Sequence, residues 1–354
     1  MTDTLLERPP DTPAPRGDTL EQPRDADDVW IAPSPDQVDP DYALRGPLGA
    51  GGMAVVWLAE QLPLAREVAV KCARDGDDAE ASMLLLREAT ITGQLEHPNI
   101  VPVHALISVR DGPAVVMKRL TGDTWDVLIR RGELSLERHL DIFTQVLNAV
   151  AFAHSRGVLH RDIKPSNVMI GEFGEVYLLD WGVARREGDP ESDAIVGTPC
   201  YLAPEMAEGK ADERTDVFLL GATLHEVLTL EPRHRGLTPL ELLYHAMHVE
   251  PYPYRDVPEE LAAICNRACA RDPSARFASV NALRAAVAAF REHRAAWALS
   301  EAAEAELTQL VRAVDDRSVG DAAVQQRFVQ ARFGFETALR QWPESPEALA
   351  GLTR

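Results

Sequence analysis

The order of two hydrophobic patterns along the chain constrains its fold most. Strand-like apolar runs come first, at residues 42–44, 55–58, 68–70, 103–108 and 114–117. One helical pattern, over residues 79–95, interrupts them, and from residue 135 onward apolar residues recur mainly at helical spacing. Strands followed by helices predict an α+β protein with a small sheet-rich lobe and a larger helical lobe.

A glycine cluster separates the first two strand-like runs. Gly49, Gly51 and Gly52 stand in the segment between Leu48 and Val56. Glycine lets the backbone bend sharply and approach the oxygens of a bound phosphate. A plain hairpin turn uses the same residues, so the cluster by itself leaves both interpretations open.

A lysine, Lys71, ends the strand-like run over residues 68–70, and Glu88 lies within the predicted helix. An ion pair between this strand and this helix would aim the lysine ammonium at the phosphates of a nucleotide. The alternative is an incidental surface pair, which would contribute little to stability.

A dense run of polar residues follows the helix predicted over residues 135–154. It reads His160-Arg161-Asp162-Ile163-Lys164-Pro165-Ser166-Asn167, and Asp180-Trp181-Gly182 follows an apolar run shortly after it. Phosphoryl transfer needs a carboxylate that orients the attacking hydroxyl, a cation on the migrating group and a metal that screens phosphate charge. Asp162 and Lys164 can supply the first two. Asn167 and Asp180 offer hard oxygen ligands for Mg²⁺, so the set as a whole indicates phosphoryl transfer rather than a series of turns.

Together these motifs resemble the Hanks-type (eukaryotic-like) serine/threonine protein kinases, bacterial members in particular, over residues 42–290. The resemblance implies a bilobal protein-kinase fold with an N-lobe over residues 41–119 and a C-lobe over residues 120–294. It also implies transfer of the γ-phosphoryl group of ATP to serine or threonine hydroxyls of proteins, this chain included, in bacterial signalling. The implied cofactors are ATP and Mg²⁺ (or Mn²⁺).

The resemblance assigns roles to individual residues. Asp162 corresponds to the catalytic base and Lys164 to the lysine that contacts the γ-phosphate. Lys71 and Glu88 correspond to the ion pair between strand and helix. The resemblance also implies which residues bind the cofactors. Asn167 and Asp180 are expected to bind the metal. The residues expected to contact ATP are Leu48, Gly49, Ala50, Gly51, Gly52, Val56, Ala69, Lys71, Met117, Lys118, Leu120 and Met169.

Further residues resemble the structural anchors of that family. Glu205, the last residue of an Ala-Pro-Glu motif, is expected to pair with Arg276, and Asp216 is expected to anchor the catalytic loop. Lys164 and Thr198 fit the serine/threonine members. Small-molecule phosphotransferases of related fold usually lack this activation segment, so a protein substrate is the favoured hypothesis.

The sequence departs from the family pattern at three positions. Ala54 replaces the third glycine of the glycine-rich loop, and Trp181 replaces the usual phenylalanine after the metal-binding aspartate. Lys118, at the start of the hinge (residues 118–120), replaces the glutamate that the family often has there. It directly follows Met117, which is expected at the back of the nucleotide pocket. Hinge contacts to adenine use backbone groups, so the side chain of Lys118 is expected to be tolerated. Ala54 is expected to stiffen the loop and slightly weaken its closure, and Trp181 leaves Asp180 and Gly182 in place, so activity is expected to remain.

The main alternative is a pseudokinase or scaffold that acts through its tails. Such a protein would be expected to lack Lys71, Asp162, Asn167 or Asp180, and none of them is missing. The activation segment carries Ser192 among acidic residues, where an added phosphate is costly unless a cation faces it. Arg161 can be that cation or can pair with an existing acid, and we expect partial activity without phosphate at Ser192.

Composition excludes several other classes. The chain has 354 residues and a formal net charge of −20, which argues against general binding to nucleic acid or to anionic membranes. No apolar stretch is long enough to span a bilayer, and the N-terminus lacks a signal peptide. Four cysteines do not form a disulfide framework, and Cys265 and Cys269 are interpreted as thiols rather than as a metal pair. We therefore expect a cytoplasmic protein.

The two ends of the chain differ from its centre. Residues 1–40 are acidic and rich in proline, so they are predicted to be disordered. Residues 295–354 are predicted to form a helical extension, and residues 333–352 weakly resemble the helix–Pro–helix part of a tetratricopeptide unit. The apolar face of this extension is expected either to pack on the large lobe or to bind a partner or a second copy. Both possibilities are open at this point.

Overall fold

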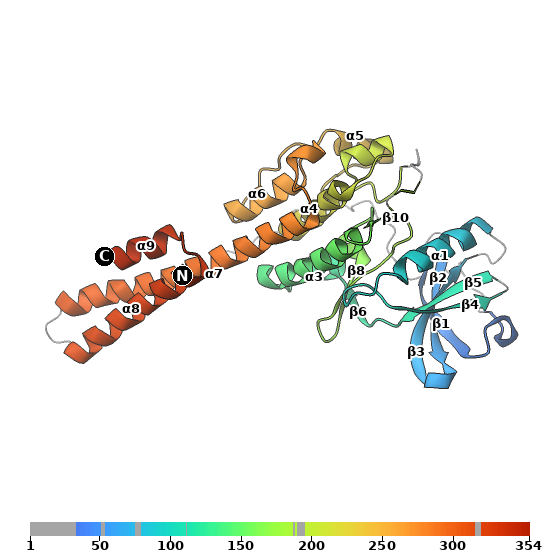
Figure 1. Cartoon of the computed structure of the whole chain (residues 1–354), viewed down its shortest axis with the longest axis horizontal. Helices are drawn as coiled ribbons and strands as arrows, with labels where there is room; N and C mark the ends of the chain where they lie inside the picture. The colour runs from blue at the N-terminus through green and yellow to red at the C-terminus, as the bar shows by residue number, and fades with distance from the viewer. Residues whose placement is uncertain are drawn as a thin grey trace. The chain divides into compact units, whose positions relative to one another are not determined.

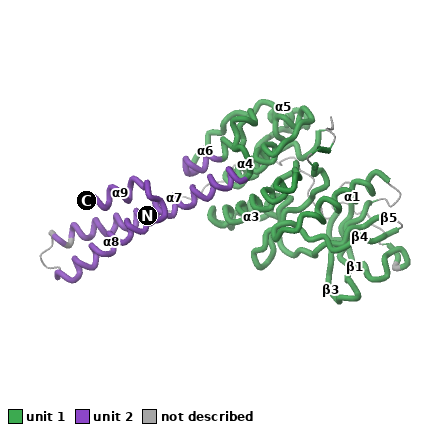
Figure 2. Tube along the Cα trace, in the orientation of Figure 1, with its two compact units in different colours: residues 1–255, 265–280 green, residues 256–264, 281–354 purple. Residues whose placement is uncertain are grey.

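The computed structural model describes residues 33–50, 54–74, 79–110, 112–186, 188–189, 195–315 and 320–354. It divides into two compact units (Figure 2). The first comprises residues 1–255 and 265–280, and the second comprises residues 256–264 and 281–354. The first unit contains the sheet and the candidate site, and the second is helical. The predicted α+β class is confirmed.

A five-stranded antiparallel sheet forms the small lobe, with its strands in the order β1-β2-β3-β5-β4 (Figure 1). The strands are β1 Tyr42–Ala50, β2 Ala54–Gln61, β3 Arg66–Ala73, β4 Val103–Val109 and β5 Gly112–Lys118. Helix α1, Ala79–Thr92, packs on one face of the sheet, where Leu85 and Ala89 contact Val115. Each element coincides with a predicted pattern, so the small lobe follows the hydrophobic periodicity of the sequence.

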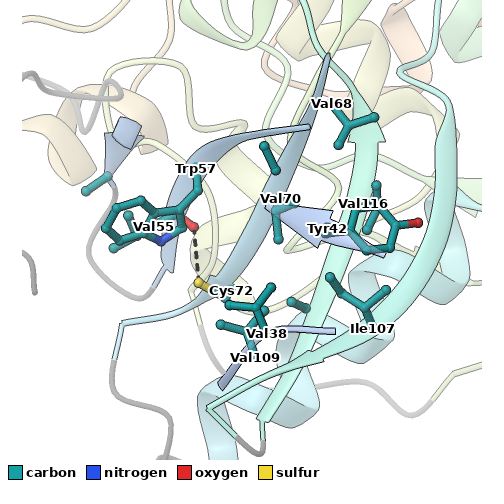
Figure 3. Close-up of a cluster of buried hydrophobic side chains, with 13 residues drawn as sticks. Val38, Tyr42, Val55, Trp57, Val68, Val70, Cys72, Ile107, Val109 and Val116 are labelled. Atoms are coloured by element: carbon teal, nitrogen blue, oxygen red, sulfur yellow. Dashed lines mark hydrogen bonds between the residues drawn. The ribbon is translucent and has the colours of Figure 1, made fainter. Parts of the chain in front are cut away.

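Along β3, side chains that fill the core of the small lobe alternate with side chains that face the candidate site. Val68, Val70 and Cys72 belong to a buried cluster that also contains Trp57 (Figure 3). Successive side chains of a strand point to opposite faces of the sheet. Ala69 and Lys71 therefore face the side that carries α1, so the lysine is placed opposite the helix without disturbing the core.

The small lobe begins earlier than the sequence pattern predicted. A short 3₁₀ helix, Pro35–Gln37, leads to Val38, which is 8% exposed, belongs to the buried cluster and forms a bridge with Val109. The predicted disordered tail over residues 1–40 is therefore wrong for residues 33–40, because one buried valine among prolines and aspartates makes no periodic pattern. Residues 1–32 lie outside the described part of the chain.

The large lobe is built around buried helices. Its elements are β6 Gly122–Thr124, α2 Trp125–Arg131, α3 Leu136–His154, β7 Val158–Leu159, β8 Val168–Gly171, β9 Val176–Leu178, β10 Arg185–Arg186, α4 Glu213–Thr229 and α5 Pro239–Met247. Ser135 caps α3 by accepting a hydrogen bond from the backbone N–H of Arg138 at 3.2 Å, which confirms the predicted start of this helix. Helix α4 is buried on nearly all sides, so it forms the centre of the lobe.

The second unit is dominated by helices α7 Val280–Asp315, α8 Asp321–Gln341 and α9 Pro346–Thr353, with part of α6 Glu259–Ala268. The boundary predicted at residue 295 falls inside α7, which continues unbroken, and the compact unit resumes at residue 281. The segment contains neither glycine nor proline, so no residue in it ends the helix. Among the helices of the described ranges, none is long and apolar enough to cross a membrane.

Small residues let the helices of the second unit pack closely. Ala303, Ala331 and Ala338 surround Phe335, which is 2% exposed. A Cβ atom added at Gly351 of α9 would lie 2.3 Å from the ring of Phe335. The helix–Pro–helix arrangement predicted here is present, and its assignment as a tetratricopeptide unit stays a prediction.

Replacing Phe335 with alanine should selectively destabilise the second unit. Truncating a buried phenylalanine costs about 3–5 kcal/mol, because it loses apolar burial and leaves a cavity. Phe333, on the same helix, is 61% exposed, and its replacement should change the free energy of unfolding by less than about 0.5 kcal/mol. Urea denaturation of the two variants measures both effects. Equal losses would show that Phe335 is not in the core.

Candidate active site

The ion pair predicted between strand and helix is present. Lys71 Nζ lies 2.7 Å from both Oε1 and Oε2 of Glu88, and the two side chains are 18% and 15% exposed. Burial acts to lower the pKa of Lys71, but the carboxylates of Glu88 and Asp180 outweigh it and raise the pKa. The lysine therefore stays charged on the face of the sheet that α1 covers.

The carboxylate of Asp162 is fixed on both oxygens. Thr198 donates its backbone N–H and its hydroxyl to Oδ1, at 2.8 and 2.7 Å. Oδ2 lies 3.1 Å from Lys164 Nζ and accepts a hydrogen bond of 3.1 Å from Asn167 Nδ2. Lys164 also donates to the hydroxyl of Thr198 at 2.5 Å. Asp162, Lys164 and Thr198 of the activation segment thus form one hydrogen-bonded group.

Asn167 and Asp180 provide the oxygen atoms suited to a metal. The amide nitrogen of Asn167 donates to the backbone carbonyl and to the carboxylate of Asp162, which leaves its oxygen for a cation. Asp180 has a φ of 58°, and its Oδ1 lies 3.9 Å from Lys71 Nζ. Mg²⁺ at nucleotide sites is usually held by one or two protein carboxylates together with phosphates. This donor set fits such an ion.

Asp180 is held in its charged form. Burial acts to raise the pKa of Asp180, but the positive charge of Lys71, the backbone N–H of Gly182 and the charge of Lys164 outweigh it and lower the pKa. Its side chain is 50% exposed. An ionised, accessible carboxylate beside a lysine is the state that a metal-binding role requires.

A buried aspartate anchors the catalytic loop. Asp216, which is fully buried in α4, accepts the backbone N–H of His160 at 2.8 Å and that of Arg161 at 2.9 Å. His154 Nε2 lies 2.7 Å from the same carboxylate. Arg161 has a φ of 66°, so this carboxylate secures a backbone conformation that L-residues rarely adopt. The predicted anchoring role of Asp216 is present in the geometry.

A second buried ion pair closes the activation segment. Arg276 donates to both carboxylate oxygens of Glu205 at 2.7 Å, and its side chain is fully buried. Thr215, at the start of α4, donates its hydroxyl to Glu205 at 2.8 Å. The predicted pair of Glu205 and Arg276 is therefore present, and it attaches the end of the segment to the helical core.

The expected nucleotide contacts share one face of the sheet. Ala69 lies opposite Met117 on β5, and Lys71 lies opposite Val56 on β2. Gly49 on β1 lies opposite Val56 in turn. Positions 49, 56, 69, 71 and 117 alternate along their strands with residues of the buried cluster. They therefore lie on the opposite face of the sheet, which is the face that carries Lys71 and Glu88.

Other expected contacts lie around this face. The side chain of Ala50 is buried in the core cluster, so its backbone is the part that can meet a ligand, whereas Leu48 is 43% exposed. Gly51 and Gly52 lie outside the described residues. The central glycines of the loop therefore stay predictions.

The hinge side chain turns toward β9. Lys118 Nζ donates a hydrogen bond to the hydroxyl of Tyr177 and lies 4.7 Å from the centre of its ring. Met169 on β8 lies opposite Tyr177 and is partly buried, as is Leu120 beyond the hinge. Lys118 is thus accommodated by a partner in the large lobe.

Comparison with known proteins decides the family. The family model described as "Protein kinase domain" matches residues 42–287, which is more than half of the chain. This chain belongs to the protein kinase family. The fold expected from the resemblance, with a sheet-rich N-lobe and a helical C-lobe, is confirmed.

The kinase domain is similar to bacterial serine/threonine protein kinases. PknD of Chlamydia muridarum is 36% identical over 301 residues, which cover 72% of this chain and 32% of that protein. PknB of Mycolicibacterium smegmatis is 33% identical over 341 residues, which cover 90% of this chain and 54% of that protein. The chain thus spans between a third and about half of the length of these relatives. Both relatives are named serine/threonine-protein kinases, which is the class expected from Lys164 and Thr198.

The departures from the kinase pattern are accommodated structurally. Trp181 is 1% exposed, and its ring centre lies 4.5 Å from that of His160, so the larger indole fits the interior. Ala54 is the first residue of β2 and pairs with Ala73. Neither change displaces Lys71 from Glu88.

Two features of this kinase site were missed by sequence reasoning. The sequence pattern indicates only a substrate class for Thr198, yet its hydroxyl bonds to both Asp162 and Lys164. His154, at the end of α3, was not singled out, although it contacts Asp216. A histidine three residues before Gly157 has no local pattern that distinguishes it. Its role depends on α4, about sixty residues later in the chain.

The contact between His154 and Asp216 should make stability fall as the pH rises. Burial acts to lower the pKa of His154, but the hydrogen bond and charge of Asp216 outweigh it and raise the pKa. This stabilisation is complete below the unfolded-state pKa of about 6.5 and is lost as the pH rises through the folded-state value. Urea denaturation between about pH 6 and 9 should show the wild type losing stability relative to His154→Gln.

His139 provides a control of opposite sign. Burial lowers its pKa, so the wild type should gain stability relative to His139→Gln as the pH rises toward about 6.5. A pH-independent difference between the wild type and His154→Gln would contradict the assignment of a charged pair.

Proposed function

We propose that this chain transfers the γ-phosphoryl group of ATP to serine or threonine hydroxyls of protein substrates, itself included. The observation that carries the proposal is the orientation of Asp162, whose two carboxylate oxygens are held by Thr198, Lys164 and Asn167. A base fixed in this way needs no reorganisation when the acceptor hydroxyl arrives. The names of the relatives support serine and threonine as acceptors.

The residues of the site divide the chemistry between them. Asp162 orients the attacking hydroxyl and takes its proton, and Lys164 offsets negative charge on the migrating phosphoryl group. Lys71, positioned by Glu88, would bind the α- and β-phosphates, which are not transferred. Because each of these groups is already hydrogen-bonded in place, catalysis here rests on positioning and charge.

The proposed cofactors follow from the same residues. Asn167 and Asp180 would hold Mg²⁺ or Mn²⁺, and the bound ion would screen the phosphate charge. ATP would lie along the face of the sheet formed by Val56, Ala69 and Met117. The ionised state of Asp180 supports this assignment.

The remaining proposals concern the cellular setting. A cytoplasmic signalling role stays a prediction from the sequence. An interaction with a protein partner or a second copy through the C-terminal helices stays a prediction. It is motivated by exposed apolar residues on α8, such as Phe328 at 51%.

The first test replaces the proposed base. Asp162→Asn keeps the shape of the side chain but cannot take the proton, and loss of a general base typically costs about 10²- to 10⁴-fold in rate. Incubation of the full chain with labelled Mg·ATP and casein should show this loss, while Asp321→Asn, an exposed control in the second unit, retains transfer. A wild type without transfer would favour the pseudokinase alternative. Near wild-type transfer by Asp162→Asn would refute the assignment of the base.

A second test concerns the metal. Asp180→Ala removes the carboxylate proposed to bind Mg²⁺, so nucleotide affinity should lose its dependence on Mg²⁺. Titration with a fluorescent ATP analogue, with and without Mg²⁺, measures this dependence. The same dependence in wild type and variant would place the metal elsewhere.

A further inference from the structure

An arginine cluster forms where the activation segment begins. It consists of Arg87 on α1, Arg161 in the catalytic loop and Arg185 on β10. Arg185 Nη2 donates to the carbonyl of Ala211 at 3.0 Å, while its buried Nε and Nη1 have no hydrogen-bond partner among the described residues. Burial and the charges of Arg185 and Arg87 lower the pKa of Arg161, so the cluster is electropositive.

One carboxylate of the activation segment meets this cluster. Asp189 Oδ2 lies 2.9 Å from Arg87 Nη2 and accepts the backbone N–H of Arg186 at 3.1 Å. Its charge also attracts Arg161. The side chains of Arg87 and Asp189 are 51% and 32% exposed, so this pair is accessible to water. Asp189 thus supplies negative charge at the place where three arginines converge.

Helix α1 connects the pair of Arg87 and Asp189 to the ion pair of Lys71 and Glu88. Arg87 is the residue next to Glu88, which holds Lys71. A second link joins the same two elements, because Arg186 Nη2 donates to Gln94 Oε1 at 2.5 Å just beyond the end of α1. The start of the activation segment is therefore attached to the helix that positions Glu88.

The catalytic loop is attached to the same stretch of chain. Arg161 Nε donates to the carbonyl of Val183 at 2.7 Å. Asp162, the next residue, is the proposed base. Asp189 thus contacts the helix that carries Glu88, and Val183 contacts the loop that carries Asp162.

We propose that Asp189 is a positioning residue whose carboxylate holds α1 so that Lys71 and Glu88 stay paired without any phosphate on the activation segment. The inference rests on the proposed kinase activity and adds a built-in device that keeps the site assembled. Asp189 acts through Arg87 and does not touch the reacting groups. Ser192, the hydroxyl considered from the sequence, lies outside the described residues.

The test compares phosphatase-treated full-length variants, with the phosphatase removed before the assay. The wild type and Ser192→Ala should both transfer phosphate from labelled Mg·ATP to casein. Asp189→Asn should lower kcat by about 2- to 5-fold, the range for an exposed ion pair, with the KM for casein unchanged, because α1 does not bind the acceptor. Asp189→Glu, which restores the charge, should recover most of the loss. Circular dichroism and a thermal melt verify that each variant is folded.

A double-mutant cycle isolates the pair. Arg87→Gln alone should lower kcat to a similar extent, and the double variant Arg87→Gln/Asp189→Asn should lose little more than either single variant. Glu304→Gln, which breaks an exposed ion pair with Arg354 in the second unit, serves as the control and should leave kcat unchanged.

Three results would overturn the inference while leaving the kinase assignment intact. The first is an active wild type with an equally active Asp189→Asn, and the second is a wild type that phosphatase treatment silences. Additive losses in the cycle would also overturn it, because they would show that Asp189 does not act through Arg87. A wild type inactive both before and after phosphatase treatment would overturn the proposed function itself.

Discussion

The buried carboxylate of Asp216 is the interaction on which the active site depends. It has no contact with solvent, yet it accepts two backbone N–H groups of the catalytic loop and contacts His154. An uncompensated buried charge is strongly destabilising, so these donors and the carboxylate need one another. Because Asp162 directly follows the left-handed Arg161, this anchor sets the position of the proposed base.

The activation segment is held at both of its described ends by charge. At one end Asp189 meets Arg87, and at the other Glu205 meets the fully buried Arg276. Between them Thr198 bonds directly to Asp162. A buried ion pair such as Glu205 with Arg276 adds little net stability over apolar packing, but its geometry is specific and costly to break. Its contribution here is to fix the path of the segment past the proposed base.

The sheet holds a charged lysine on one face and an apolar core on the other. Alternation along β3 sends Val68, Val70 and Cys72 into the buried cluster and Lys71 to the opposite face. Glu88 on α1 then compensates the charge of the lysine. The same alternation on β5 places Met117 with Lys71, so a single register produces both the core and the face proposed for ATP.

The sequence by itself determined the order of strands and helices, the pairs of Lys71 with Glu88 and Glu205 with Arg276, and the anchoring role of Asp216. These follow from hydrophobic periodicity and from motifs whose spacing reflects one family of folds. The tertiary structure alone decided that residues 33–40 join the small lobe and that Asp189 meets Arg87. Such features rest on single residues brought together by folding, across 102 positions in the case of Asp189 and Arg87, so they produce no local pattern.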